Sequence, residues 1–158
     1  MKEKEKKVMI FGTFDGLHEG HLDFFKQAKK LSGKTELIVS IARDKNVAKL
    51  KGQIPLFNEK KRMSLVKKCD LVDKVVLSGL GDHIPHIIKE APDIIALGYD
   101  QKFYIKNLKK YLKDKGISIK IVRLKPYKEK IYKSHLLNKK KIIIIISVIN
   151  KSKKTCKR

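Results

Sequence analysis

Short apolar runs alternate with amphipathic stretches through most of the chain. The first run, Val8 to Phe11, is continuously apolar and stops at Gly12, which is typical of a strand buried on both faces. From His21 to Ser32 apolar residues recur three and four positions apart, and Gly33 follows where a C-terminal helix cap is expected. This pattern predicts a strand, a glycine-rich turn and a helix at the start of the fold.

The same alternation continues to residue 121. Further strands are expected over residues 37–42, 74–77, 93–97 and 117–121. The last of these alternates in polarity, which favours an edge strand. Further helices are expected from Asn58 to Cys69, from an Asp82 cap with Pro85 in the first turn, and over residues 102–115 up to Gly116. In the short helix after Asp82, we expect three isoleucines on the buried side: Ile84, Ile87 and Ile88.

Strands that alternate with helices of this length predict parallel βαβ units. The fold class is therefore α/β: a single doubly wound, parallel, five-stranded Rossmann-like sheet with helices on both faces. Ligands of such sheets bind beyond the carboxyl ends of the strands, where the winding reverses. The loops after the first and fourth strands are the expected site.

The two ends of the chain differ from its middle. Residues 1–7 are mostly charged and are expected to be a frayed end, the single domain covers residues 8–137, and residues 138–158 are a divergent tail rich in Lys and Ile. We assign this tail no function. Its apolar run, Ile142 to Ile149, is far shorter than the ~20 residues needed to span a bilayer, so no membrane association is expected.

The composition is strongly basic, with 39 Lys and Arg against 16 Asp and Glu and a formal net charge of +23. Such a charge could attract polyanions. However, nearly all the cations are lysines spread along the chain, and aromatic residues make up only 7%. Nucleic-acid binding is therefore not the favoured interpretation. The two cysteines form no CxxC pair and no secretory signal is visible, which favours the cytoplasm.

The candidate chemistry lies in the turn after the first strand, Gly12 to His21. Its glycines allow the backbone to turn tightly and approach a ligand. His18 and His21 lie at the mouth of the following helix, where free N–H groups and the helix dipole attract phosphate. Two imidazole donors in that field suit the charge that develops on a phosphate during nucleotidyl transfer, a reaction that needs no protein nucleophile.

This string, GTFDGLHEGH, resembles the signature of the HxGH nucleotidyltransferases, a group of cytidylyltransferases and adenylyltransferases. The later segments 42–52, 59–62, 72–73, 92–93 and 97–101 are most similar to the archaeal type of FAD synthase, and next to glycerol-3-phosphate cytidylyltransferase. The resemblance implies that an acceptor phosphate, that of FMN in the first interpretation, attacks the α-phosphorus of ATP or CTP. Pyrophosphate would leave, and Mg²⁺ would be carried with the triphosphate.

The resemblance also implies roles for individual residues. Three match catalytic groups: His18, His21 and Lys51. Nucleotide contacts are implied for Gly12, Thr13, Phe14, Asp15, Lys49, Asp100, Gln101 and Ser134. Arg62 matches an arginine that helps to hold the acceptor, and a further phosphate contact falls to Arg123 or Lys125. No residue is expected to bind a resident metal ion, and His83 and His86 are interpreted as ordinary surface histidines.

Two alternatives stay open at this stage. One is cytidylyl transfer from CTP to glycerol 3-phosphate in place of adenylyl transfer to FMN. The other is a protein of a different class, a nucleotide- or RNA-binding module without catalysis, against which the presence of both histidines argues. The sequence does not indicate the oligomeric state, and a homodimer is one open alternative.

Overall fold

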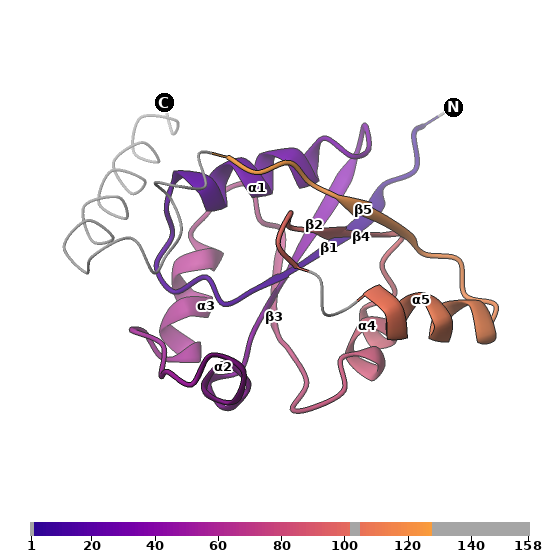
Figure 1. Cartoon of the computed structure of the whole chain (residues 1–158). Coiled ribbons are helices and arrows are strands. Elements are labelled where there is room, and N and C mark those ends of the chain that lie inside the picture. Colours follow the sequence, from indigo (N-terminus) through magenta and orange to yellow (C-terminus); the bar gives the residue numbers. More distant parts are fainter. Residues whose placement is uncertain (1, 102–104, 128–158) are drawn as a thin grey trace, which may run out of the picture.

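A computed structural model of the chain describes residues 2–101 and 105–127. Their strands form one parallel sheet of five strands in the order β3-β2-β1-β4-β5 (Figure 1). In chain order the elements are β1 Lys6–Gly12, α1 Glu19–Lys29, β2 Thr35–Ile41, α2 Asp44–Lys51, α3 Glu59–Lys67, β3 Lys74–Leu77, α4 Ile84–Glu90, β4 Ile94–Leu97, α5 Ile105–Asp114 and β5 Lys120–Arg123. The doubly wound α/β fold expected from the sequence is confirmed.

The winding reverses at β1. This strand pairs with β2 along its whole length, from Lys6 beside Thr35 to Gly12 beside Ile41, and with β4 on its other side. The loops after β1 and β4 therefore leave the same edge of the sheet at the point of reversal, where ligands of doubly wound sheets bind.

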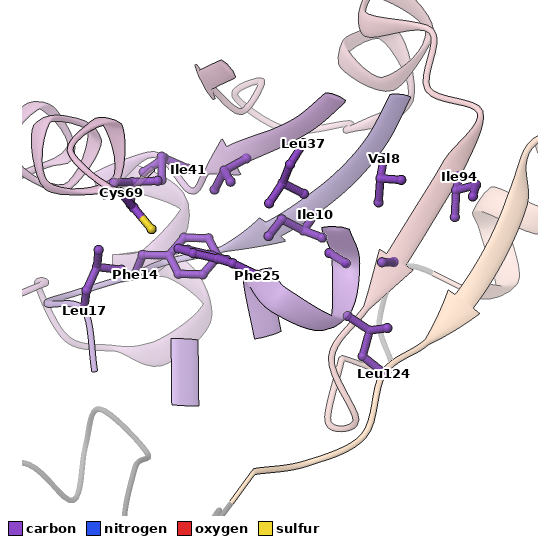
Figure 2. Packing of buried hydrophobic residues seen from close by; sticks show 14 residues of the cluster. Val8, Ile10, Phe14, Leu17, Phe25, Leu37, Ile41, Cys69, Ile94 and Leu124 are labelled. Carbon is purple, nitrogen blue, oxygen red and sulfur yellow. The ribbon is translucent and has the colours of Figure 1, made fainter. Parts of the chain in front are cut away.

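The sheet is covered on both faces because β1 sends alternate side chains in opposite directions. Val8 and Ile10 join a cluster that contains Phe25 and Ala28 of α1 and Val66 of α3 (Figure 2). The other cluster lies under α4 and α5 on the opposite face of the sheet (Figure 1) and consists of Met9, Phe11, Ile38, Ile87, Ile95, Leu97, Leu108 and Leu112. This burial of β1 on both faces of the sheet explains the continuous apolar run in its sequence.

The boundaries of the first helix differ from the expectation. α1 begins at Glu19 because His18 serves as its N-cap, and it ends at Lys29 with Lys30 as the C-cap. Gly33 is therefore not the cap that its position in the sequence suggested. The N–H of Lys30 donates to the carbonyls of the preceding turn and closes the helix without a glycine.

The first and last strands in the chain also begin at other residues than expected. β1 begins at Lys6, so residues 6 and 7 are not part of a frayed end: the Lys6 N–H donates to the Lys34 carbonyl at 2.9 Å and the Lys7 N–H to Asp93 Oδ2 at 2.9 Å. β5 begins at Lys120 and not at residue 117, because the Ile117 N–H donates to the Leu112 carbonyl and closes α5. Among the described strands β5 pairs with β4 alone, so it is an edge strand of this sheet, as expected.

The sequence pattern did not predict α2, and it assigned one exposed residue of α4 to the buried side of that helix. α2, Asp44–Lys51, was not expected as a helix; it ends at Gly52, whose φ of 65° is left-handed. On α4, Ile87 is buried as expected, but Ile88 is 40% exposed. The N-cap of α4 is His83 and not Asp82, although Asp82 Oδ1 accepts the N–H of Ile84, the first residue of the helix.

Candidate active site

The turn between β1 and α1 is built around Phe14. This residue has a φ of 51°, and its ring packs on that of Phe25 (Figure 2), with 5.4 Å between the ring centroids. The same ring lies edge-on to His21, with 5.2 Å between the centroids. A Cβ atom on Gly12 would lie 2.7 Å from the Phe14 ring, so a glycine is required there. The Phe14 side chain is buried in the core, so the nucleotide contact implied for this residue would come from its backbone.

His18 and His21 cap each other at the start of α1. His18 Nδ1 accepts the backbone N–H of His21 at 3.4 Å, and His21 Nδ1 accepts the backbone N–H of His18 at 3.3 Å. The two rings stack with centroids 3.7 Å apart and an angle of 22° between their planes. This capping box fixes the orientation of both imidazoles relative to the helix N-terminus.

The reciprocal cap also fixes the protonation of both rings. A backbone N–H can only donate, so each Nδ1 is an acceptor and each neutral ring carries its proton on Nε2. Burial lowers the pKa of His18 to about 4. Burial is also the largest cause that lowers the pKa of His21, helped by the charges of His18 and Lys51 and opposed by a hydrogen bond with the Gly16 backbone. Near pH 7 both rings are neutral Nε2–H donors.

Lys51 approaches the same turn from α2. Its Nζ lies 3.4 Å from Thr13 Oγ1, which brings an exposed ammonium to the residue before Phe14. Lys49 is exposed near the end of the same helix. The structure thus brings together Lys51 and Thr13, two of the residues for which the resemblance implied a role. It does so through a helix that the hydrophobic pattern did not reveal.

Asp15 has a contact that the sequence did not suggest. Its two carboxylate oxygens accept the N–H groups of Leu56 and Phe57 at 2.7 and 2.8 Å. The segment 52–57, which we call the strap, is thereby fastened to the motif. The Asp15 carboxylate therefore holds the strap, and the nucleotide contact implied for this residue stays a prediction.

Arg62 is completely buried on α3. Each of its guanidinium nitrogens serves a different segment: Nη1 donates to the Thr13 carbonyl at 2.7 Å, Nη2 to Asp44 Oδ1 at 2.6 Å and Nε to the Phe57 carbonyl at 3.0 Å. The direct acceptor contact implied for Arg62 is at odds with this burial, because the side chain offers no exposed surface.

A second loop, Gly98 to Gln101, follows β4 at the point of reversal. Gln101 Nε2 donates to the Phe11 carbonyl at 2.7 Å and its Oε1 accepts the Gly98 N–H at 2.9 Å. Arg123 Nη1 donates to the Gly98 carbonyl at 2.7 Å and so braces the same loop. Asp100 is exposed beside them. Through this hydrogen bond from Gln101 to Phe11, the loop is joined to the end of β1, just before the first turn.

The remaining predicted residues lie elsewhere in the structure or outside the described residues. The Lys125 backbone is tied to the Gln27 side chain, with its N–H donating to Gln27 Oε1 at 3.0 Å. Ser134 and the tail from residue 138 lie outside the described residues. His83 and His86 are not simple surface histidines: both are half-buried, and His86 Nε2 lies 2.9 Å from Ser40 Oγ.

Two further findings concern the described residues as a set. Within the described ranges, no group of three or more His, Cys, Asp or Glu residues could hold a metal ion. No helix in the part of the chain that the structure describes has the length and apolar character to cross a membrane.

A parallel sheet that places two neutral imidazole donors and a lysine around the turn after its first strand defines a nucleotidyltransferase. More specifically, the chain belongs to the cytidylyltransferase-like family, whose model matches residues 9–154.

The chain is similar to two relatives of known name and to one solved structure. The FAD synthase of Thermoplasma volcanium is 41% identical over 134 residues, covering 85% of this chain and 92% of that protein. The FAD synthase of Methanothermus fervidus is 46% identical over 122 residues, covering 77% and 83%. The crystal structure of a lipopolysaccharide core biosynthesis protein from Thermoplasma volcanium aligns with a TM-score of 0.70 and 43% sequence identity, covering 77% of this chain and 98% of that chain.

Proposed function

We propose that this nucleotidyltransferase is an FAD synthase, which transfers the adenylyl group of ATP to the phosphate of FMN and releases pyrophosphate. The observation that best supports nucleotidyl transfer is the reciprocal capping of His18 and His21, which presents two Nε2–H donors at the helix N-terminus. The relatives named FAD synthase, 41% and 46% identical over most of their length, support the choice of substrates.

The reaction follows from these donors. An oxygen of the FMN phosphate attacks the α-phosphorus of ATP, one O–P bond forms, and the bond between the α-phosphorus and the bridging oxygen breaks in line with it. His18 and His21 donate hydrogen bonds to the phosphate oxygens as negative charge accumulates, and Lys51 adds a positive charge beside Thr13. The attacking phosphate is already an anion, so no general base is needed.

The strap supports an acceptor with a large apolar ring. Leu50 is 69% exposed, Ile54 85% and Leu56 45%, although apolar side chains of this size are usually buried. All three lie within a few residues of Lys51, and the strap is fastened to Asp15 of the motif. A flat isoalloxazine would cover this apolar surface, whereas glycerol 3-phosphate has nothing to bury there.

We further propose that Mg²⁺ enters with the triphosphate. Magnesium keeps several waters and is usually bound by substrate phosphates with one or two carboxylates. The described residues around the turn offer no clustered carboxylates, since Asp15 is engaged by Leu56 and Phe57. The chain's own contribution is therefore to position the phosphates, and the ion would offset the charge of the triphosphate.

Pyrophosphate release tests the proposal directly. Wild-type protein should release pyrophosphate with ATP and FMN, and much more slowly with CTP and glycerol 3-phosphate. His18→Ala should lower kcat by about 10²- to 10³-fold, the typical cost of removing one donor to a developing oxyanion. Turnover of only the CTP pair would replace the proposed substrates, and a salt-sensitive affinity for RNA without any pyrophosphate release would indicate the non-catalytic alternative.

A further inference from the structure

The fully buried Arg62 contacts the turn after β1 through a hydrogen bond to its backbone. We propose that Arg62 is a positioning residue, which fixes the direction of the Thr13–Phe14 peptide so that the Phe14 N–H can donate to the triphosphate. The proposal rests on the proposed nucleotidyl transfer. This positioning role replaces the acceptor contact that the family resemblance implied for Arg62.

The burial of Arg62 needs an explanation. A guanidinium without exposed surface loses its hydration, which is costly unless every direction is paired. Among the described residues, only the Asp44 carboxylate forms an ion pair with this guanidinium, and the Asp44 side chain is itself 35% exposed. Burial acts to raise the pKa of Asp44, but the hydrogen bonds from Arg62 and from the Glu59 N–H outweigh it and lower the pKa. The other two hydrogen bonds from Arg62 go to backbone carbonyls. The buried guanidinium therefore holds the backbone in place at these two positions.

The bond to the Thr13 carbonyl controls the next N–H. A trans peptide is planar, and its C=O and N–H point in opposite directions. With the Thr13 carbonyl held 2.7 Å from Arg62 Nη1, the Phe14 N–H points away from the buried guanidinium. Within the described residues, no hydrogen bond is formed by this N–H. It is therefore available to a phosphate oxygen at the helix N-terminus.

The conformation of Phe14 makes this control necessary. A φ of 51° is uncommon for a bulky residue and costs energy that the surroundings must supply. On one side the Phe14 ring packs on Gly12 and Phe25, and on the other Arg62 holds the preceding carbonyl. Without that bond the peptide could relax towards an ordinary conformation, which would turn its N–H away from the ligand.

The same guanidinium couples the turn to two other segments. Its third nitrogen holds the Phe57 carbonyl at the end of the strap, and Asp44 begins α2, which carries Lys51. Only a planar fork can reach these three acceptors together; the ammonium of a lysine is a single point charge. Replacing Arg62 with lysine keeps the charge opposite Asp44 and removes the geometry.

The experiment compares Arg62→Lys with Arg43→Lys, a matched control in which an ion pair to Glu59 can persist. With ATP and FMN, positioning predicts that Arg62→Lys lowers kcat by about 10- to 100-fold, as expected for misplaced catalytic groups, and leaves KM for FMN within about twofold. Arg43→Lys should stay near wild type. A rise of KM for FMN with kcat retained, or no change at all, would overturn the proposal.

Two further measurements keep the proposal testable if Arg62→Lys does not fold. Asp44→Asn retains the arginine but removes its counter-ion, and should give the same loss of kcat without a change in KM for FMN. In ¹⁵N-labelled wild-type protein, the Phe14 amide proton should shift downfield when a non-hydrolysable ATP analogue binds. An unchanged Phe14 amide would overturn the proposal. If FMN is not a substrate but another phosphorylated acceptor is, the proposed substrates fail while the same kcat and KM comparison still tests Arg62.

Discussion

The imidazoles of His18 and His21 lie face to face, 3.7 Å apart between ring centroids, and each ring accepts the backbone N–H of the other residue. A proton added to either Nδ1 would break a helix cap. It would also place a positive charge against the neighbouring ring and the helix N-terminus. The two donors of the site are therefore coupled to the stability of α1.

This coupling predicts a loss of stability in acid. The pKa of His18 is about 4 in the folded protein and has its ordinary value of 6.5 in the unfolded chain. Between these values the unfolded chain binds a proton that the folded protein does not, so the free energy of unfolding falls as the pH drops from 6.5 to about 4. The loss from this residue should be on the order of 3 kcal/mol. Thermal melts across that pH range measure it.

His18→Asn is the control, because asparagine is a good N-cap that does not titrate. The variant should lose part of the pH dependence of Tm between pH 6.5 and 4 while retaining a folded α1. If the variant and wild type lose stability in parallel over this range, His18 is not the titrating group.

Lys51→Ala should reduce activity more than the loss of other lysines from the same helix. Its Nζ lies 3.4 Å from Thr13 Oγ1, beside the proposed phosphate site, whereas Lys45 is exposed elsewhere on α2. We expect kcat/KM for ATP to fall by about 10- to 100-fold for Lys51→Ala, the range of a charge-assisted contact. Lys45→Ala should match wild type in the pyrophosphate-release assay. Equal effects of both substitutions would mean that net charge, not position, matters.

The central features of the site could be predicted because their signals are local. A strand buried on both faces, glycines in the turn and histidines at a helix N-terminus all lie within 8–21, and each follows from local backbone geometry. The winding of the sheet followed from the order of the elements. These are the parts of the fold that sequence pattern can specify.

The missed parts depend on residues distant in the chain. α2 buries only Val47 and therefore shows little periodicity; its first residue, Asp44, exchanges caps with Glu59 of α3, each carboxylate accepting the N–H of the other residue. The burial of Arg62 depends on acceptors at positions 13, 44 and 57. No pattern along one segment reports such a convergence, and a charged residue on a helix is normally taken as exposed.

Ile54→Ser tests whether the strap contacts the acceptor. Ile54 is 85% exposed, so its replacement removes little packing from the folded protein. If isoalloxazine covers it, KM for FMN should rise about 3- to 10-fold, the cost of losing part of an apolar contact, while KM for ATP stays unchanged. Ile88→Ser is the matched control, since Ile88 is 40% exposed on α4. An unchanged KM for FMN in Ile54→Ser would place the ring elsewhere.

Gln101 should contribute mainly to stability, because its amide joins the carboxyl ends of β1 and β4. Its Nε2 donates to the Phe11 carbonyl, and its Oε1 accepts the Gly98 N–H. Gln101→Glu keeps the shape and the acceptor but places a carboxylate oxygen against the Phe11 carbonyl, where neither group can donate. We expect unfolding to become easier by about 1–3 kcal/mol, the cost of an unsatisfied buried polar group, as measured by urea denaturation.

A substitution at the neighbouring Asp100 separates this bracing from a nucleotide contact. Asp100 is exposed, so Asp100→Asn should leave the urea midpoint unchanged. If Asp100 contacts the nucleotide, as the family resemblance implies, Asp100→Asn should instead raise KM for ATP. Because the Gln101 amide sets the spacing between the two strand ends, Gln101→Glu should lower both the stability and kcat. A Gln101→Glu protein as stable as wild type would show that the winding reversal does not depend on this bridge.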